Sequence, residues 1–151
     1  MKYYIIVCFI FVSVFAKAQT NSNKKEVVLT RITMDINEIQ DPLLFGSSID
    51  ISLKPSKMSE KYATHTLLGS IGFDEVRTVQ LDLIAKKMEK SAISSSSINL
   101  NFRSRFADEF IGVLNFVFEF SDGTNYPFRL GRVAIGNDGT INRISRTIMI
   151  H

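Results

Sequence analysis

Alternation of apolar and polar residues predicts about six β-strands along this chain. Residues 28–36 place their apolar side chains on one parity, and residues 49–53 repeat the pattern before Pro55. In the second half the same pattern returns over 98–106, 113–120, 126–135 and 144–150. A period of two is typical of half-buried strands, so an antiparallel sheet is expected to dominate the fold.

Turn residues separate the later strands and predict how they connect. Residues 121–125 (Ser-Asp-Gly-Thr-Asn) and 137–139 (Asn-Asp-Gly) have the composition of hairpin turns. The apolar parity changes between Leu130 and Val133, which needs one extra residue, and Gly131 is the predicted site of that bulge. Short connections predict that the last four strands form an antiparallel meander.

The segment between residues 56 and 93 admits two interpretations. A short helix could run from residues 59–61 to Leu68, and a second helix over 74–91 is favoured by apolar spacings of three and four and by the composition of residues 85–90. Alternatively, residues 79–85 form a seventh strand. The first interpretation predicts an α+β fold, an antiparallel β-meander sheet with one or two helices packed on one face. The second predicts an all-β sandwich or barrel.

The N-terminal eighteen residues have the features of a signal peptide. Lys2 precedes an apolar run, and Ala16-Lys17-Ala18 is the small-x-small pattern at which signal peptidases cleave. The run is shorter than the roughly 20 residues that span a bilayer, although an uncleaved anchor is the alternative. We therefore expect a signal peptide over 1–18, a flexible lead-in over 19–26 and one globular domain over 27–151. The destination is the periplasm or the exterior, with no membrane span after cleavage.

Composition narrows the possible chemistry. Hydrophobic residues make up 45% of the chain and charged residues 22%, which excludes a disordered chain. Cys8 is the single cysteine and would leave with the signal peptide, and there are two histidines, so no metal site and no cofactor are expected. Removing Lys2 and Lys17 lowers the formal net charge from +3 to +1. A basic surface for nucleic acid is therefore not predicted.

Few residues suggest catalysis. Glu119, within an apolar strand, is the candidate base for a carboxylate-dependent hydrolase or isomerase. Ser70 and His65 are close in sequence, but the glycine two positions before the serine of a G-x-S-x-G motif is missing. The protein is expected to be non-catalytic, with Glu119 as the exception to test.

The polar side of the strand over 98–106 is the predicted binding surface. It carries Asn99, Asn101, Arg103 and Arg105, and Arg129 is expected on a neighbouring strand. The neighbouring strands of the meander are also expected to carry Arg132, Arg143 and Arg146. Arginine forks suit carboxylate, phosphate or sulfate groups and are enriched at interaction surfaces. The principal hypothesis is a small exported binding module whose Arg- and Asn-bearing sheet face contacts a protein, glycan or small-molecule partner.

A ligand pocket is the second binding hypothesis. A helix closing over a curved sheet would form a cone lined by Phe116, Phe118, Tyr126 and Phe128. Gly139-Thr140-Ile141 after a turn resembles the end of the nuclear-transport-factor-2-like superfamily, over a small part of the chain. That resemblance implies a cone that binds a small apolar ligand. The family opens with helices, whereas this chain is predicted to open with strands.

Overall fold

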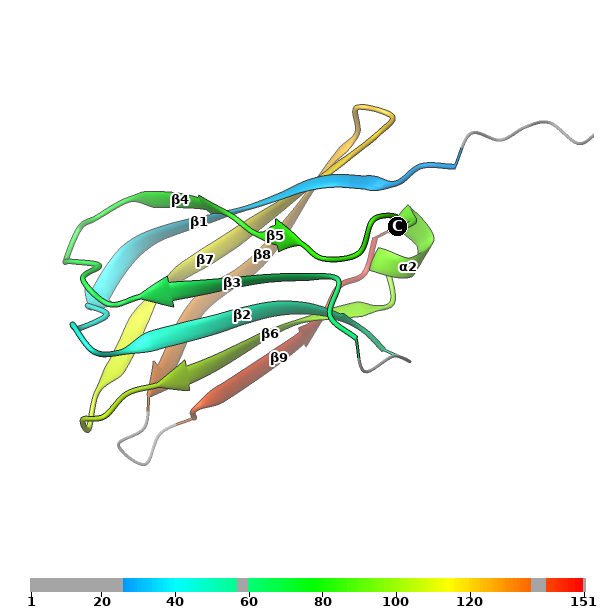
Figure 1. Cartoon of the computed structure of the whole chain (residues 1–151). Coiled ribbons are helices and arrows are strands. Elements are labelled where there is room, and N and C mark those ends of the chain that lie inside the picture. Colours follow the sequence, from blue (N-terminus) through cyan, green and yellow to red (C-terminus); the bar gives the residue numbers. More distant parts are fainter. Residues whose placement is uncertain (1–25, 57–59, 137–140, 151) are drawn as a thin grey trace, which may run out of the picture.

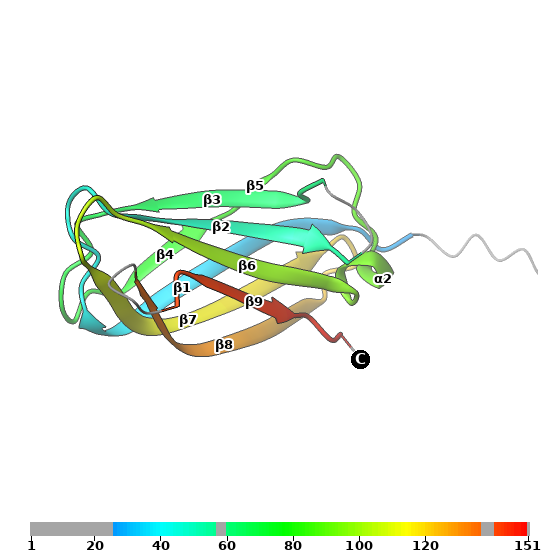
Figure 2. The same ribbon diagram turned by 90° about the horizontal axis from the view of Figure 1, so that it is seen from below.

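Two antiparallel sheets pack face to face in this protein (Figures 1 and 2). The computed structural model describes residues 26–56, 60–136 and 141–150. The first sheet has the order β4–β1–β7–β8, formed by β1 (Leu29–Asp41), β4 (Arg77–Gln80), β7 (Glu109–Phe120) and β8 (Asn125–Gly136). The second has the order β5–β3–β2–β6–β9, formed by β2 (Ser48–Pro55), β3 (Ala63–Leu68), β5 (Asp82–Leu83), β6 (Ser96–Arg103) and β9 (Arg143–Thr147).

The core lies between the sheets and follows the predicted alternation. In β7 every second side chain is buried, and β6 repeats the same pattern. The largest fully buried side chains come from both sheets: Phe110, Phe116, Phe118, Ile32, Met34, Ile36, Ile49, Ile51 and Leu53. Burying one such side chain contributes about 1.5–3 kcal/mol, so the sandwich rests on this layer.

The helical interpretation of residues 59–91 is largely wrong. Residues 63–68 form β3, and β4 and β5 occupy 77–83, so within the described residues the helical part is α2 (Lys90–Ile93). Leu81, between β4 and β5, is fully buried and its N–H donates to the carbonyl of Ile32. Residues 77–83 pair with β1 and β3, and the N–H groups of Ala85 and Lys90 donate to carbonyls distant in the sequence, so these contacts override the local helix propensity of 85–90. The all-β sandwich describes the fold, and the α+β class holds only for this short helix.

The predicted meander of the last four strands is also wrong. β6 pairs with β2 and β9, whereas β7 pairs with β1 and β8, so the chain crosses between sheets after β6 and again after β8. The hairpin is confirmed only between β7 and β8, where Asp122 accepts hydrogen bonds from the backbone and hydroxyl of Thr124 at 2.9 and 2.6 Å. The turn predicted at 137–139 lies outside the described residues.

The bulge predicted at Gly131 is confirmed. Leu114 lies opposite Gly131 while Asn115 lies opposite Arg129, which leaves Leu130 as the extra residue. Gly131 has a φ of +77°, a left-handed conformation that favours glycine. Because of this extra residue, the side chains of β8 that face the core are even-numbered up to Phe128 and odd-numbered from Val133 onward.

The start of the described chain is fastened to the segment before α2. Leu29 N–H donates to the carbonyl of Met88, and Glu26 forms an ion pair with Lys87. A hydrogen bond shared with Glu89 lowers the pKa of Glu26 and raises the pKa of Glu89.

The predicted signal peptide and all but the last residue of the lead-in lie outside the described residues. No described helix has the length and apolar character needed to cross a bilayer.

Candidate binding groove

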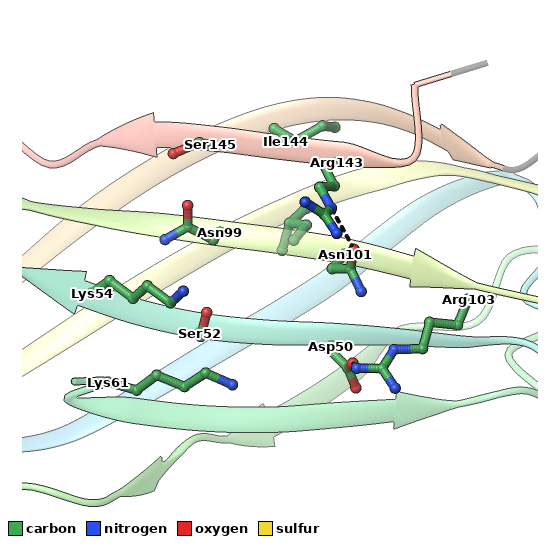
Figure 3. A pocket seen from close by; sticks show the side chains of 11 residues that line it. Asp50, Ser52, Lys54, Lys61, Asn99, Asn101, Arg103, Arg143, Ile144 and Ser145 are labelled. Atoms are coloured by element: carbon green, nitrogen blue, oxygen red, sulfur yellow. Dashed lines mark hydrogen bonds and ion pairs between the residues drawn. The ribbon is translucent and has the colours of Figure 1, made fainter. Parts of the chain in front are cut away.

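A polar groove of about 420 Å³ lies on the outer face of the second sheet (Figure 3). Its lining comes from β2, β6 and β9, with one residue from the segment before β3. The lining residues are Asp50, Ser52, Lys54, Lys61, Asn99, Leu100, Asn101, Arg103, Arg143, Ile144 and Ser145.

Strand alternation and register produce this arrangement. In β2 and β6 the apolar residues face the core, so the intervening polar residues must face outward. The register then aligns polar residues across the strands in two rows. One row is Thr66, Asp50, Asn101 and Arg143, and the next is Thr64, Ser52, Asn99 and Ser145. Residues from four separate strands therefore form one surface.

Hydrogen bonds hold one end of the groove. Asp50 accepts a hydrogen bond from the hydroxyl of Thr66 at 3.0 Å and forms an ion pair with Arg103 at 2.6 Å. Arg143 Nε donates to Asn101 Oδ1 at 3.0 Å. The Arg103 side chain is 70% exposed, so its ion pair stabilises the fold by little, and its guanidinium is available to a ligand.

The other end of the groove carries uncompensated positive charge. Figure 3 shows Lys54 and Lys61 there, at the opposite end from Asp50 and Arg103. Among the described residues, neither lysine has an ion pair, and the Nδ2 of Asn101 and the Oδ1 of Asn99 have no hydrogen-bond partner. The lining combines four cationic side chains with a single carboxylate, Asp50. The groove therefore presents positive charge together with amide and hydroxyl groups.

The structure brings together three of the five predicted binding residues. Asn99, Asn101 and Arg103 line the groove. Arg105 is exposed in the loop after β6, beyond the groove lining. Arg129 lies on β8, in the other sheet, so it does not join this surface.

Several groove residues were missed by the sequence analysis. They are Asp50, Ser52, Lys54, Lys61 and Ser145. Arg143 lies on β9 beside β6, on a neighbouring strand as expected. The polar parity of 50–54 was visible in the sequence, but only the pairing of β2 with β6 shows that it continues the face of Asn99 and Asn101.

The candidate catalytic residue Glu119 lies on the outer face of the first sheet. Arg31 contacts it through two nitrogens, at 2.8 and 2.6 Å, and this carboxylate raises the pKa of Arg31. Such a pair is typical of a solvated sheet face with a cross-strand ion pair. Ser70 and His65, the other pair considered, share no hydrogen bond in the described part of the chain.

The four residues proposed to line a cone are core or near-core residues. Phe116 and Phe118 are fully buried between the sheets, and their ring centroids lie 6.4 and 6.5 Å from that of Phe128. Tyr126 is half-buried and donates its hydroxyl hydrogen to the carbonyl of Met149. These rings thus contribute packing between the sheets.

No cluster of three or more potential metal ligands occurs among residues 26–56, 60–136 and 141–150.

No protein-family model matches the chain, and no curated protein sequence or solved structure is significantly similar to it. Fold and site together define a two-sheet β-sandwich with a cationic, amide-bearing groove on one outer face.

Proposed function

We propose that this protein is an exported, non-catalytic binding module that takes an anionic, hydroxyl-rich ligand along the groove of the second sheet. An acidic oligosaccharide has the matching chemistry, since its carboxylates suit lysine and arginine and its hydroxyls suit amides and serines. Export is proposed from the features of residues 1–18.

The observation that carries the proposal is the unequal charge of the groove. Lys54 and Lys61 have no acidic partner among the described residues, whereas Asp50 at the far end is already satisfied by Thr66 and Arg103. A ligand with negative charge near the lysines gains charge-assisted hydrogen bonds without displacing an existing ion pair. Such bonds are about twice as strong as neutral ones.

Binding without catalysis is supported by the same residues. The single carboxylate of the lining is engaged by a guanidinium and a hydroxyl, so it is a poor general base. Acid–base hydrolysis of a glycoside needs a pair of carboxylates flanking the bond, and the lining contains one.

Calorimetric titration with tetragalacturonate tests the proposal, with neutral maltotetraose as the uncharged comparison. The pair Lys54→Ala/Lys61→Ala is expected to weaken binding of tetragalacturonate by about tenfold or more. The matched control is Arg129→Ala/Arg132→Ala, which removes the same charge from the other sheet and is expected to leave the affinity within about twofold. Binding that weakens with salt is also expected, since exposed charges are screened.

Three results would contradict the proposal. They are the absence of binding to both carboxylated and sulfated oligosaccharides, equal affinity for maltotetraose, and equal losses in the two double variants. The last result would mean that total charge, and not the groove, determines binding.

A further inference from the structure

Three loops at one end of the sandwich carry exposed apolar side chains. These are the loops over 42–47, 69–76 and 104–108, at the left in Figure 1, opposite the end where the described termini lie. Phe45 is 87% exposed, Phe73 65% and Phe106 63%. We call this surface the apolar end, formed by Leu44, Phe45, Leu68, Phe73, Val76 and Phe106.

The first two loops are joined by backbone hydrogen bonds. Leu43 and Ile71 pair as an isolated antiparallel bridge, and Ser70 N–H donates to the carbonyl of Leu43 at 2.7 Å. An apolar notch of about 420 Å³ lies between the loops, with Phe45 and Phe73 among its lining residues. Backbone hydrogen bonds thus fix the loops that carry Phe45 and Phe73.

The loop over 42–47 is also fastened to the loop over 104–108. Ser47 donates to Asp108 and shares a 2.8 Å hydrogen bond with Ser104, and all three side-chain oxygens are buried or half-buried. A methyl group at Gly46 would lie 3.6 Å from the Phe106 ring, so that ring lies against the loop over 42–47. The loop over 42–47 therefore lies between the other two, in the order seen in Figure 1.

Glu75 holds the loop that presents Phe73. It accepts a hydrogen bond from the Gly72 N–H at 2.9 Å and pairs with Arg77 at 2.6 Å. The Gly72 amide, followed by Arg77, lowers the pKa of Glu75. Glu75 is therefore occupied within its own loop, whereas Asp74 beside it has no partner among the described residues.

The two outer loops of the apolar end expose side chains of opposite charge. Asp74 is exposed on the loop over 69–76, and Arg105 is exposed on the loop over 104–108, with no partner among the described residues. A two-fold axis through the central loop would place Asp74 of each copy opposite Arg105 of the other. The three loops together contain the acidic residues Asp74, Glu75 and Asp108 and the basic residue Arg105, so this end does not attract anionic lipid.

The exposed area is also suitable for association. The three phenylalanines alone expose about 400 Å², taking about 200 Å² for a whole phenylalanine. Leu44, Leu68 and Val76 add to this area. A standard interface buries about 800 Å² per partner, so the apolar end supplies most of the area that a small dimer needs.

We propose that two copies of this chain associate through the apolar end in an isologous, two-fold dimer. Phe45 of each copy packs against the notch region of the other, and the Asp74–Arg105 pairs close the two sides. An isologous contact of this kind is self-limiting, so the assembly stops at two copies. The groove lies on a sheet face and not at this end, so dimer formation leaves it accessible.

Sedimentation equilibrium of the full chain, as produced by its host, tests this proposal. The wild-type protein is expected to show a monomer–dimer equilibrium, and Phe45→Asp is expected to raise the dissociation constant by about thirtyfold or more. Ile84→Asp is the matched control, since Ile84 is 57% exposed outside the apolar end, and it is expected to leave the equilibrium unchanged. Circular dichroism checks that each variant is folded.

A charge exchange separates the two-fold dimer from other associations. Asp74→Arg and Arg105→Asp are each expected to weaken the dimer, and the double variant is expected to restore it. A monomeric wild-type protein, a double variant weaker than both single variants, or monomers that bind lipid vesicles through Phe45 would overturn the proposal. Tetragalacturonate affinity measured on Phe45→Asp distinguishes this failure from failure of the groove, because the groove residues are intact in that variant.

Discussion

Substitution of Gly69 by alanine tests how closely the loops of the apolar end are packed. A Cβ at this position would lie 1.8 Å from the Leu44 carbonyl oxygen and 2.6 Å from its carbonyl carbon. Both are backbone atoms, so a side-chain rotation cannot relieve the overlap, and the loop over 42–47 must move. That movement breaks the hydrogen bonds from Gly69 N–H to Ser47 O at 2.9 Å and from Ser70 N–H to Leu43 O at 2.7 Å.

The expected cost follows from these contacts. Each lost backbone hydrogen bond contributes about 1 kcal/mol, and the strain of an inserted methyl adds about 1–3 kcal/mol. We therefore expect Gly69→Ala to lower the free energy of unfolding by about 3–5 kcal/mol, measured by urea denaturation followed by circular dichroism. Gly72→Ala is the control in the same loop, because its Cβ would meet nothing closer than Glu75 Oε2 at 4.0 Å. An unfolding midpoint of Gly69→Ala equal to that of Gly72→Ala would refute the packing argument.

Three further predictions concern the core and the ionisable groups. Phe118→Ala is expected to lower the free energy of unfolding by about 3–5 kcal/mol in the same assay, whereas Glu119→Gln, its neighbour on the solvated face, should cost at most about 1 kcal/mol; similar losses would contradict the assignment of the two faces. The lowered pKa of Asp122 means that its contribution to stability is present above its unfolded pKa and disappears as pH falls through its folded pKa. Melting temperatures of Asp122→Ala and wild type should therefore differ at neutral pH and converge in acid, and a constant difference would disprove it. The raised pKa of Glu89 has the opposite sign, so its contribution is present below its unfolded pKa and is lost as pH rises through its folded pKa. Glu89→Gln, which keeps a hydrogen-bond donor towards Glu26, should remove that part of the pH dependence of the melting temperature, and an unchanged pH profile would argue against the shared hydrogen bond.

Local sequence features predicted the elements whose cause is local. The β7–β8 hairpin depends on Asp122 and its neighbours, and the bulge depends on a parity change beside Gly131. Both are encoded within a few residues of where they occur. The buried rows of β6 and β7 were predictable for the same reason, because alternation in the sequence directly gives the two faces of a strand.

Features that depend on distant partners were not predictable in this way. Residues 85–90 favour a helix locally, but the residues before them pair with the edges of β1 and β3, and the partners in β1 lie more than forty positions earlier in the chain. The meander failed because β6 finds its partner in β2, about fifty residues earlier in the chain. Sheet membership is a property of the whole chain and not of a segment.

Residues of the candidate site that share one strand were predictable, whereas those that depend on strand pairing were not. Asn99, Asn101 and Arg103 share one strand, so their common face was predictable. Arg129 was placed with them wrongly because its strand belongs to the other sheet. The strand predicted over 98–106 would include Phe106 in its inward row, yet β6 ends at Arg103 and the phenylalanine is exposed in the following loop. Its exposure results from loop geometry, which alternation does not describe.

An amide NMR titration of ¹⁵N-labelled protein with tetragalacturonate tests whether the outer face of the second sheet binds an anionic ligand. Saturable shifts are expected at Ser52, Lys54, Lys61, Asn99 and Asn101, with the amides around Arg129 on the other sheet unchanged. Shifts spread evenly over both sheets, or none at the groove residues at saturating ligand, would contradict it.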